Sequence, residues 1–235
     1  SYTFGESIIG TLTVTPVAIE LTAASDGKAY DGTPLTNSNY TITKGAFVGE
    51  EGLATVTIAG SQTLVGTSAN TITGHTLKDN TLAQNYTITY QPGELKVTQN
   101  EKAITITANS HTWEYDGQPH SDGGYTVTFG EESYTVAAGE SAKLSTGDTV
   151  TAIITKQVKN VADSADVNNA IVTLTIDNTA QYANVSQANG TLTITAKPLT
   201  ITADSAEKVY DGQPLTKNSF TNTELAEGDK LTATV

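Results

Sequence analysis

One short landmark recurs three times along this 235-residue chain. Residues 30–35 read YDGTPL, residues 115–119 read YDGQP and residues 210–215 read YDGQPL. Each copy follows an alternating opening segment, at 17–24, 102–109 and 197–204, and glycine-led closing segments stand at 10–15, 93–98 and 190–195. Landmarks that coincide at one spacing indicate tandem repeats, each of which is one structural unit. The chain is therefore predicted to be a row of small modules.

The same landmarks predict the module boundaries. Residues 1–16 are expected to be the tail of a preceding module, and residues 17–101 and 102–196 to be complete modules. Residues 197–235 are expected to be the first half of a further module, because LTATV at 231–235 matches LATVT at 53–57. No Gly/Ser-rich linker separates the modules, and Pro16 and Pro198 restrict two of the junctions. Short, stiff junctions predict an extended rod whose partners are neighbouring modules of the same chain.

Strand patterns dominate inside each module. Thr alternates with Val, Ile or Leu over short segments, and no long segment has a helical period. The expected strands of the first complete module are 18–23, 39–44, 54–59, 70–77, 85–91 and 94–98. Those of the second are 103–108, 125–129, 133–138, 148–155, 170–176 and 190–195. Short strands at this spacing predict an all-β fold of tandem antiparallel β-sandwich modules, immunoglobulin-like in topology. A β-grasp-like sheet is the alternative, although it needs a helix that the sequence does not show.

Charge and composition limit which molecules the chain could bind and which chemistry its residues could carry out. The chain carries 25 acidic residues against 12 basic ones, and its net charge is −13. Such a chain repels polyanions, so nucleic acid is excluded as a partner and insertion of this region into a membrane is not expected. Cysteine is absent, which excludes thiolate catalysis, disulfides and Cys-ligated zinc.

The repeated motifs resemble a known family. The YDG-x-P-L corner, the later G-T-S-x-N-T-I at 66–72, and the closing N-Y-x-I and G-x-L-x-V between 85 and 97 are similar to the YDG/MBG-type tandem modules of large Gram-positive surface proteins, which are adhesins. The resemblance covers essentially the whole chain. It implies a secreted, usually wall-attached protein whose β modules form a stalk.

The repeated Asp invites a catalytic interpretation, which the sequence disfavours. General acid–base catalysis needs a partner group within hydrogen-bond reach, and no second carboxylate or His accompanies the Asp in all three copies. We therefore expect a turn in which Asp caps the backbone, Gly supplies a positive φ and Pro stops the strand. No catalytic residue is expected, and the chain is not expected to be an enzyme. The structural turn residues are Tyr30, Asp31, Gly32, Pro34, Tyr115, Asp116, Gly117, Pro119, Tyr210, Asp211, Gly212 and Pro214.

The middle copy departs from the other two. Trp113 stands where the flanking copies have Lys28 and Lys208, and His120 replaces the Leu that follows Pro. An exposed Trp113 beside Tyr115 could stack on a sugar ring, which makes Trp113, Tyr115 and His120 candidate ligand-binding residues. The alternative is that Trp113 packs against the module or an interface.

Metal binding is not expected from the acidic and His residues around the middle corner. On a strand, His111 and Trp113 share one face while Glu114 and Asp116 point to the other, which divides the potential ligands. No cofactor is expected. Calcium is the one metal left open, because the chain is acidic, although no EF-hand-type loop occurs.

These observations favour a non-enzymatic, extracellular stalk, secreted or wall-anchored, that projects a binding region from a bacterial surface. One alternative is a carbohydrate- or mucin-binding module that contacts a host glycan or surface protein. Another is a filament subunit that self-assembles through incomplete terminal modules.

Overall fold

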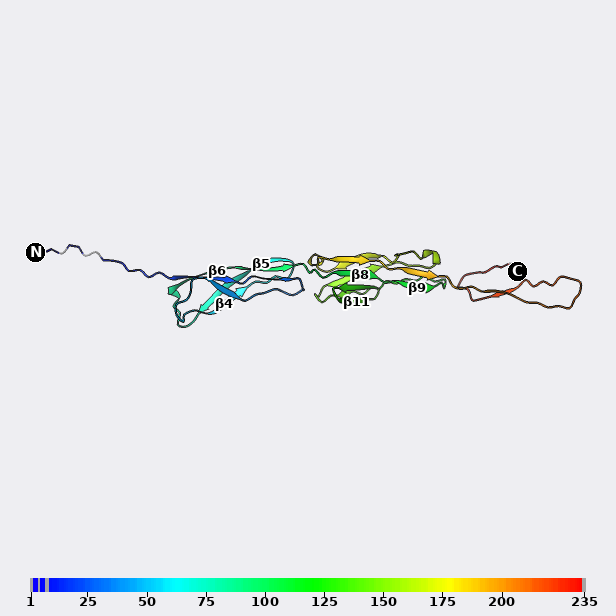
Figure 1. Cartoon of the computed structure of the whole chain (residues 1–235), viewed down its shortest axis with the longest axis horizontal. Helices are drawn as coiled ribbons and strands as arrows, with labels where there is room; N and C mark the ends of the chain where they lie inside the picture. Colours follow the sequence, from blue (N-terminus) through cyan, green and yellow to red (C-terminus); the bar gives the residue numbers. More distant parts are fainter. Residues whose placement is uncertain (1, 4, 7–8, 234–235) are drawn as a thin grey trace. The chain divides into compact units, whose positions relative to one another are not determined.

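The computed structural model describes residues 2–3, 5–6 and 9–233, and it is all-β as the sequence predicts (Figure 1). Within those residues the helical segments are three single 3-10 turns, η1 (Ala83–Asn85), η2 (Val161–Asp163) and η3 (Thr179–Gln181). The chain divides into two compact units, Ser1–Asn100 and Glu101–Val235. Parts of the expected segments 1–16 and 231–235 lie outside the described residues, and residues 9–16 contain no strand.

The first unit consists of two small sheets. One has the order β3-β1-β6 and the other the order β2-β7-β5-β4. Their strands are β1 (Val17–Ala23), β2 (Asp26–Ala29), β3 (Tyr40–Lys44), β4 (Leu53–Ala59), β5 (Gly66–Leu77), β6 (Tyr86–Gln91) and β7 (Gly93–Thr98). Except for β2, each corresponds to an expected strand, and β5 begins four residues earlier than expected.

The opening and closing strands of the first unit pair in parallel, so the prediction of a purely antiparallel module is wrong. Strand β1 lies parallel to β6 from Val17–Tyr86 to Thr22–Gln91, and β2 lies parallel to β7. The other pairs, β1–β3, β4–β5 and β5–β7, are antiparallel. Alternation along a strand shows which side chains are buried but not the direction of its neighbour, and the whole module serves as the crossover that parallel strands need.

The second unit repeats this arrangement in its first part. Strand β8 (Ile104–Ala108) lies parallel to β15 (Val185–Ala188), and β9 (His111–Glu114) lies parallel to β16 (Leu192–Thr195). The sheets have the orders β11-β10-β8-β15, β12-β13-β14, β16-β9 and β17-β18. The remaining strands are β10 (Tyr125–Phe129), β11 (Glu132–Val136), β12 (Ala142–Lys143), β13 (Thr149–Ile154), β14 (Ile171–Ile176), β17 (Ile201–Ala203) and β18 (Phe220–Asn222).

Aliphatic and aromatic side chains alternate into the core, with Thr largely facing out. In β8 the buried residues are Ile104, Ile106 and Ala108, and in β10 they are Tyr125, Val127 and Phe129. The first unit has a core cluster of Ile19, Leu21, Ala23, Ile72 and Tyr86. Burial of each large apolar side chain stabilises the fold by roughly 1.5–3 kcal/mol. The Thr/aliphatic pattern thus lets the strands of each unit bury small apolar clusters.

A buried Asn joins the opening and closing strands in the same way in both units. Asn70 Nδ2 donates to the carbonyls of Ala24 (2.9 Å) and Asn37 (2.8 Å), and its residue pairs with Gly93. Asn70 is fully buried. Because side-chain amides satisfy backbone carbonyls that no strand reaches, this Asn stabilises the bend between β1 and β2.

The second unit contains the equivalent contacts. Asn169 is also fully buried, and its Nδ2 donates to the carbonyls of Asn109 (2.8 Å) and Asp122 (2.9 Å). It forms an antiparallel bridge with Gly190. A Cβ on Gly190 would lie 2.0 Å from the Asn109 carbonyl oxygen, and one on Gly93 would lie 2.4 Å from that of Ala24. The closing segment therefore begins with glycine because the two strands approach too closely for a side chain.

Candidate interaction site at the Tyr-Asp-Gly corners

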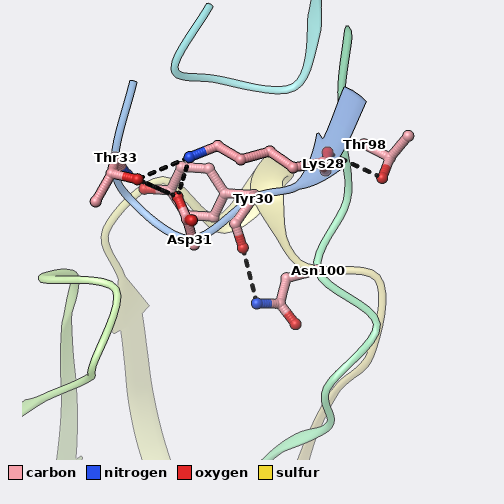
Figure 2. Close-up of polar contacts among 6 residues, drawn as sticks. All are labelled: Lys28, Tyr30, Asp31, Thr33, Thr98 and Asn100. Atoms are coloured by element: carbon pink, nitrogen blue, oxygen red, sulfur yellow. Dashed lines mark hydrogen bonds and ion pairs between the residues drawn. The ribbon is translucent and has the colours of Figure 1, made fainter. Parts of the chain in front are cut away.

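The first Tyr-Asp-Gly corner is a tight turn built around one carboxylate (Figure 2). Asp31 Oδ1 accepts hydrogen bonds from the Thr33 backbone N–H (2.9 Å), Thr33 Oγ1 (2.8 Å) and Lys28 Nζ (2.7 Å). Gly32 has φ 80°, a conformation that glycine adopts without strain. The Lys28 ammonium and the Thr33 N–H lower the pKa of Asp31 from 3.8 to about 2.

Tyr30 connects this corner to the closing strand. Its backbone N–H donates to the Thr98 carbonyl (2.8 Å), and its carbonyl accepts from Asn100 Nδ2 (2.8 Å) (Figure 2). Tyr30 itself is 3% exposed. The closing strand therefore sets the position from which the corner projects.

The second corner keeps the carboxylate-centred turn with a different partner. Asp116 Oδ1 accepts from the Gln118 backbone N–H (2.8 Å) and lies 2.9 Å from His120 Nε2. The Gln118 N–H and then the His120 side chain lower the pKa of Asp116. Gly117 has φ 79°. The imidazole thus replaces the ammonium that Lys28 supplies in the first corner.

The third corner has the Lys again. Lys208 Nζ lies 2.7 Å from Asp211 Oδ1, which also accepts from the Gln213 N–H (3.0 Å), and both contacts lower the pKa of Asp211. Gly212 has φ 75°. This copy forms the turn although its opening residues 205–210 pair with no strand among the described residues. The turn is therefore encoded locally.

The lowered pKa values of the three corner carboxylates bear on whether these groups suit acid–base catalysis. A carboxylate whose pKa is held below its usual range is a weak base and is not protonated near neutral pH. General acids and bases in enzymes instead have pKa values shifted toward the working pH. At the corners the carboxylates are used to hold their own turns.

Trp113 is enclosed between two imidazoles. Its ring stacks on His111 with centroids 4.2 Å apart and planes 5° apart, and on His120 at 4.9 Å and 19°. Its side chain also packs against a buried cluster of Val158, Leu192 and Ile194. A sugar ring could stack on this indole only after one imidazole moved away. Tyr115 also packs on that cluster, so the three candidate ligand-binding residues lie together.

The His residues of this region belong to two separate carboxylate pairs. His111 Nδ1 lies 3.5 Å from Asp122 Oδ2, whereas His120 pairs with Asp116. In the part of the chain that the structure describes, no group of three His, Asp or Glu side chains could hold a metal ion. Nor does any described helix have the length and apolar character needed to cross a membrane.

The second corner contacts a loop of the next repeat, within the second unit. Tyr115 Oη donates to Asp229 Oδ1 (3.2 Å), and Gln118 Nε2 donates to Glu227 Oε2 (3.2 Å). Desolvation of the phenol and then its bond to Asp229 raise the pKa of Tyr115.

The backbones also meet closely at this contact. A Cβ on Gly117 would lie 3.0 Å from the carbonyl oxygen of Glu227 and 3.4 Å from Ala226 Cβ. Ala226 is buried, with 8% of its surface exposed. The corner thus fits onto the loop at 226–229 through both side chains and backbone.

The sequence analysis did not single out two residues that make key contacts, Asn70 in the core and Asp229 at the contact between corner and loop. Asn70 lies inside the repeated motif at 66–72, and its recurrence before the closing glycine was the available signal. The loop residue Asp229 follows a Gly, as Asp148 follows Gly147 in the preceding repeat, which is a weaker signal. The chain matches no family model, no curated protein and no solved structure.

Proposed function

We propose that this chain is a stretch of structural stalk from a secreted or wall-attached bacterial surface protein, with no enzymatic role. The observation that carries the proposal is the contact between the corner at 115–118 and the loop at 226–229. A junction between successive repeats resists bending when it is short and is also held by side-chain contacts. Resistance to bending at each repeat is what a stalk needs in order to project a distal region.

The proposal extends to the arrangement of the modules. Each complete repeat is an immunoglobulin-like sandwich, with a β-grasp-like sheet as the alternative, and successive repeats form an extended rod. Interfaces only between neighbours make stability approximately a sum over repeats. The acidic surface, with net charge −13, supports solubility outside the cell.

Carbohydrate binding is the second functional hypothesis, and the stacked imidazoles weigh against it. Titration with mucin-type glycans, followed by fluorescence of the single Trp, tests it directly. A saturable shift or quench at Trp113 would favour a binding module. An unchanged spectrum up to millimolar glycan would leave the structural role as the explanation.

Small-angle scattering of the whole chain tests the stalk. A compact globule of this length has a radius of gyration of about 18 Å, whereas a row of modules exceeds that value clearly. The stalk predicts the larger value at the lowest concentration measured. A radius of gyration near that of a globule would refute it.

A further inference from the structure

The first unit leaves open a sheet edge that the second unit covers. Strand β3 stands at the end of the order β3-β1-β6, and within the described residues β1 is the one strand that pairs with it. The equivalent strand of the second unit, β10, lies between β8 and β11. The first unit therefore has no counterpart of β11.

The hydrogen bonds that precede the two strands show that β3 and β10 are equivalent. The Ala24 N–H donates to the Asn39 carbonyl (2.9 Å), and the Asn109 N–H donates to the Gly124 carbonyl (3.0 Å). Each of these carbonyls belongs to the residue directly before its strand. The two strands therefore correspond from their first residue, which is a tyrosine in both.

The difference between the units comes from the connection that follows the strand. Residues 45–52 connect β3 to β4, whereas residues 130–148 connect β10 to β13 and contain β11. The strand that covers the edge in the second unit thus comes from the same repeat as the edge. The open edge in the first unit is accordingly a property of that repeat's own sequence.

The open edge leaves two apolar side chains in contact with water. Tyr40 lies opposite Ala23 and Ile42 lies opposite Leu21, and both Ala23 and Leu21 are buried in the core. Residues opposite each other in an antiparallel pair share one face of the sheet. Tyr40 is nevertheless 36% exposed and Ile42 43% exposed. These side chains are on the core side of the sheet without being covered.

In the second unit β11 covers the corresponding residues. Val136 lies opposite Tyr125, and Tyr134 lies opposite Val127. Tyr125 and Val127 are completely buried, and Val136 is 5% exposed. The second unit therefore shows what fits an edge of this kind. It is an antiparallel strand with an aromatic and a β-branched residue at alternate positions.

The backbone of the open edge is also available for pairing. Along an antiparallel strand, residues bonded to the neighbouring strand alternate with residues whose N–H and C=O point away from it. Because Asn39 is bonded to Ala24, these groups of Tyr40 and Ile42 point away from β1. A bulge and a lysine limit pairing at sheet edges, and here a bulge separates Ile42 from Lys44. The edge therefore suits a short strand.

We propose that the edge of β3 is a binding site for an extended segment of another protein, which pairs antiparallel to β3 as β11 pairs with β10. The segment places an aromatic residue opposite Ile42 and a β-branched residue opposite Tyr40. Main-chain hydrogen bonds supply the affinity, and the alternate side chains supply the specificity. Strand β11 of a second copy is already paired with its own β10, and two chains of net charge −13 repel each other. The site goes beyond the stalk function and does not rest on it.

The probe is a synthetic peptide with the sequence of residues 131–138, EESYTVAA, titrated into the labelled whole chain and followed by amide NMR. The amides of Tyr40 and Ile42 should shift saturably, with a dissociation constant on the order of 0.1–1 mM because few backbone bonds form. Those of Tyr125 and Val127 should stay in place, since β11 already covers them. Equal shifts at both strands, or none up to about 5 mM peptide, would overturn the proposal.

Two altered peptides distinguish strand pairing from contact between apolar side chains. Because Gly124 is bonded to β8, the residues of β10 that alternate with it exchange bonds with Tyr134 and Val136. N-methylation of these two residues in the peptide removes the donors and keeps the side chains. The changes Tyr134→Ser and Val136→Ser in the peptide keep the donors. Each altered peptide should bind about tenfold more weakly. Undiminished binding of the N-methylated peptide would contradict strand pairing.

One substitution in the protein locates the site. Ile42→Asp places a charge on the open edge and should weaken binding of the unaltered peptide about tenfold. Val172→Asp, at a residue of β14 that is 65% exposed, is the matched control and should leave binding unchanged. Circular dichroism establishes that both variants are folded. Equal binding by the two variants would overturn the proposal. Shifts of Tyr40 and Ile42 with the concentration of the chain alone would identify a second copy as the occupant and would also overturn it.

Discussion

The two complete repeats solve one electrostatic problem in different ways. In the first, Lys28 supplies the cation beside Asp31, whereas in the second the equivalent position holds Trp113 and the donor is His120. His120 stands where the first repeat has Leu35. The partner of the carboxylate therefore comes from the position before the corner in the first repeat and from the position after Pro in the second. The comparison teaches that the corner conserves the contact to the carboxylate, while the residue that makes it can change.

The core of the two repeats differs much less. Asn70 pairs with Gly93 and Asn169 pairs with Gly190, and the two amides donate to equivalent carbonyls, of Ala24 (2.9 Å) and Asn109 (2.8 Å), at nearly equal distances. The exposed corner positions therefore differ between the repeats, because a different side chain can make the same contact to the carboxylate. The buried Asn and Gly are the same in both repeats, because no other residues fit there.

The strongest test of that equivalence is to add one methyl group at each closing glycine. Gly93→Ala and Gly190→Ala should each destabilise their unit by about 3 kcal/mol, because the new Cβ meets backbone carbonyls that cannot move independently. Urea unfolding measures the loss, by circular dichroism for Gly93→Ala and by Trp113 fluorescence for Gly190→Ala. Gly74→Ala is the control, since its Cβ would meet nothing within 4 Å. Equal stability of test and control variants would contradict the shared junction.

Removal of the buried amide should have the next largest effect. Asn70→Ala and Asn169→Ala each leave two carbonyls without their donor, which should lower the free energy of unfolding by about 2 kcal/mol. Asn39→Ala, at an exposed side chain of the same type, should change it by less than about 0.5 kcal/mol. If only one of the two buried variants were destabilised, the repeats would not share this element.

Substitutions can give the second corner the carboxylate partner that the first corner has. His120→Leu removes the side-chain donor to Asp116, so the pKa of Asp116 should rise, as read from its carboxyl signal by NMR. Adding Trp113→Lys to that variant reproduces the pattern of the first corner and should lower the pKa again. Ser121→Ala, beside the exchanged position, is the control and should leave it unchanged. A pKa that stays high in the double variant would show that the two corners are not interchangeable.

The smallest expected effect is on the stability of the fold at low pH. Because the pKa of Asp31 is lowered from 3.8 to about 2, its ionised form stabilises the folded state above pH 4, and this contribution disappears as the pH falls toward 2. Lys28→Gln should move the pKa of Asp31 back toward 3.8. Lys44→Gln, at an exposed Lys of β3, should leave it near 2. An NMR titration of the Asp31 carboxyl distinguishes these outcomes, and a pKa near 2 in Lys28→Gln would contradict the assigned cause.

Several strands could be predicted because their own residues alternate. Segments such as 40–44 and 125–129 carry Thr and aliphatic or aromatic residues in strict order, and they form β3 and β10. The strands that escaped prediction have no such pattern. Strand β2 reads DGKA and β15 reads VSQA, and most of their side chains are exposed. They are strands only because a neighbouring strand supplies hydrogen-bond partners.

The sequence by itself determined the repeat, the all-β class and the position of each corner, because these depend on spacing, alternation and local turn chemistry. The tertiary structure alone decided that the opening and closing strands run parallel, that Trp113 is enclosed by two imidazoles, and that a corner fits a loop of the next repeat. The parallel pairing joins residues 69 positions apart and the corner–loop contact joins residues 114 positions apart, and the enclosure of Trp113 needs His120, seven positions away, in addition to the nearby His111. Local patterns do not encode such distances, since the contacts form only when the whole module has folded.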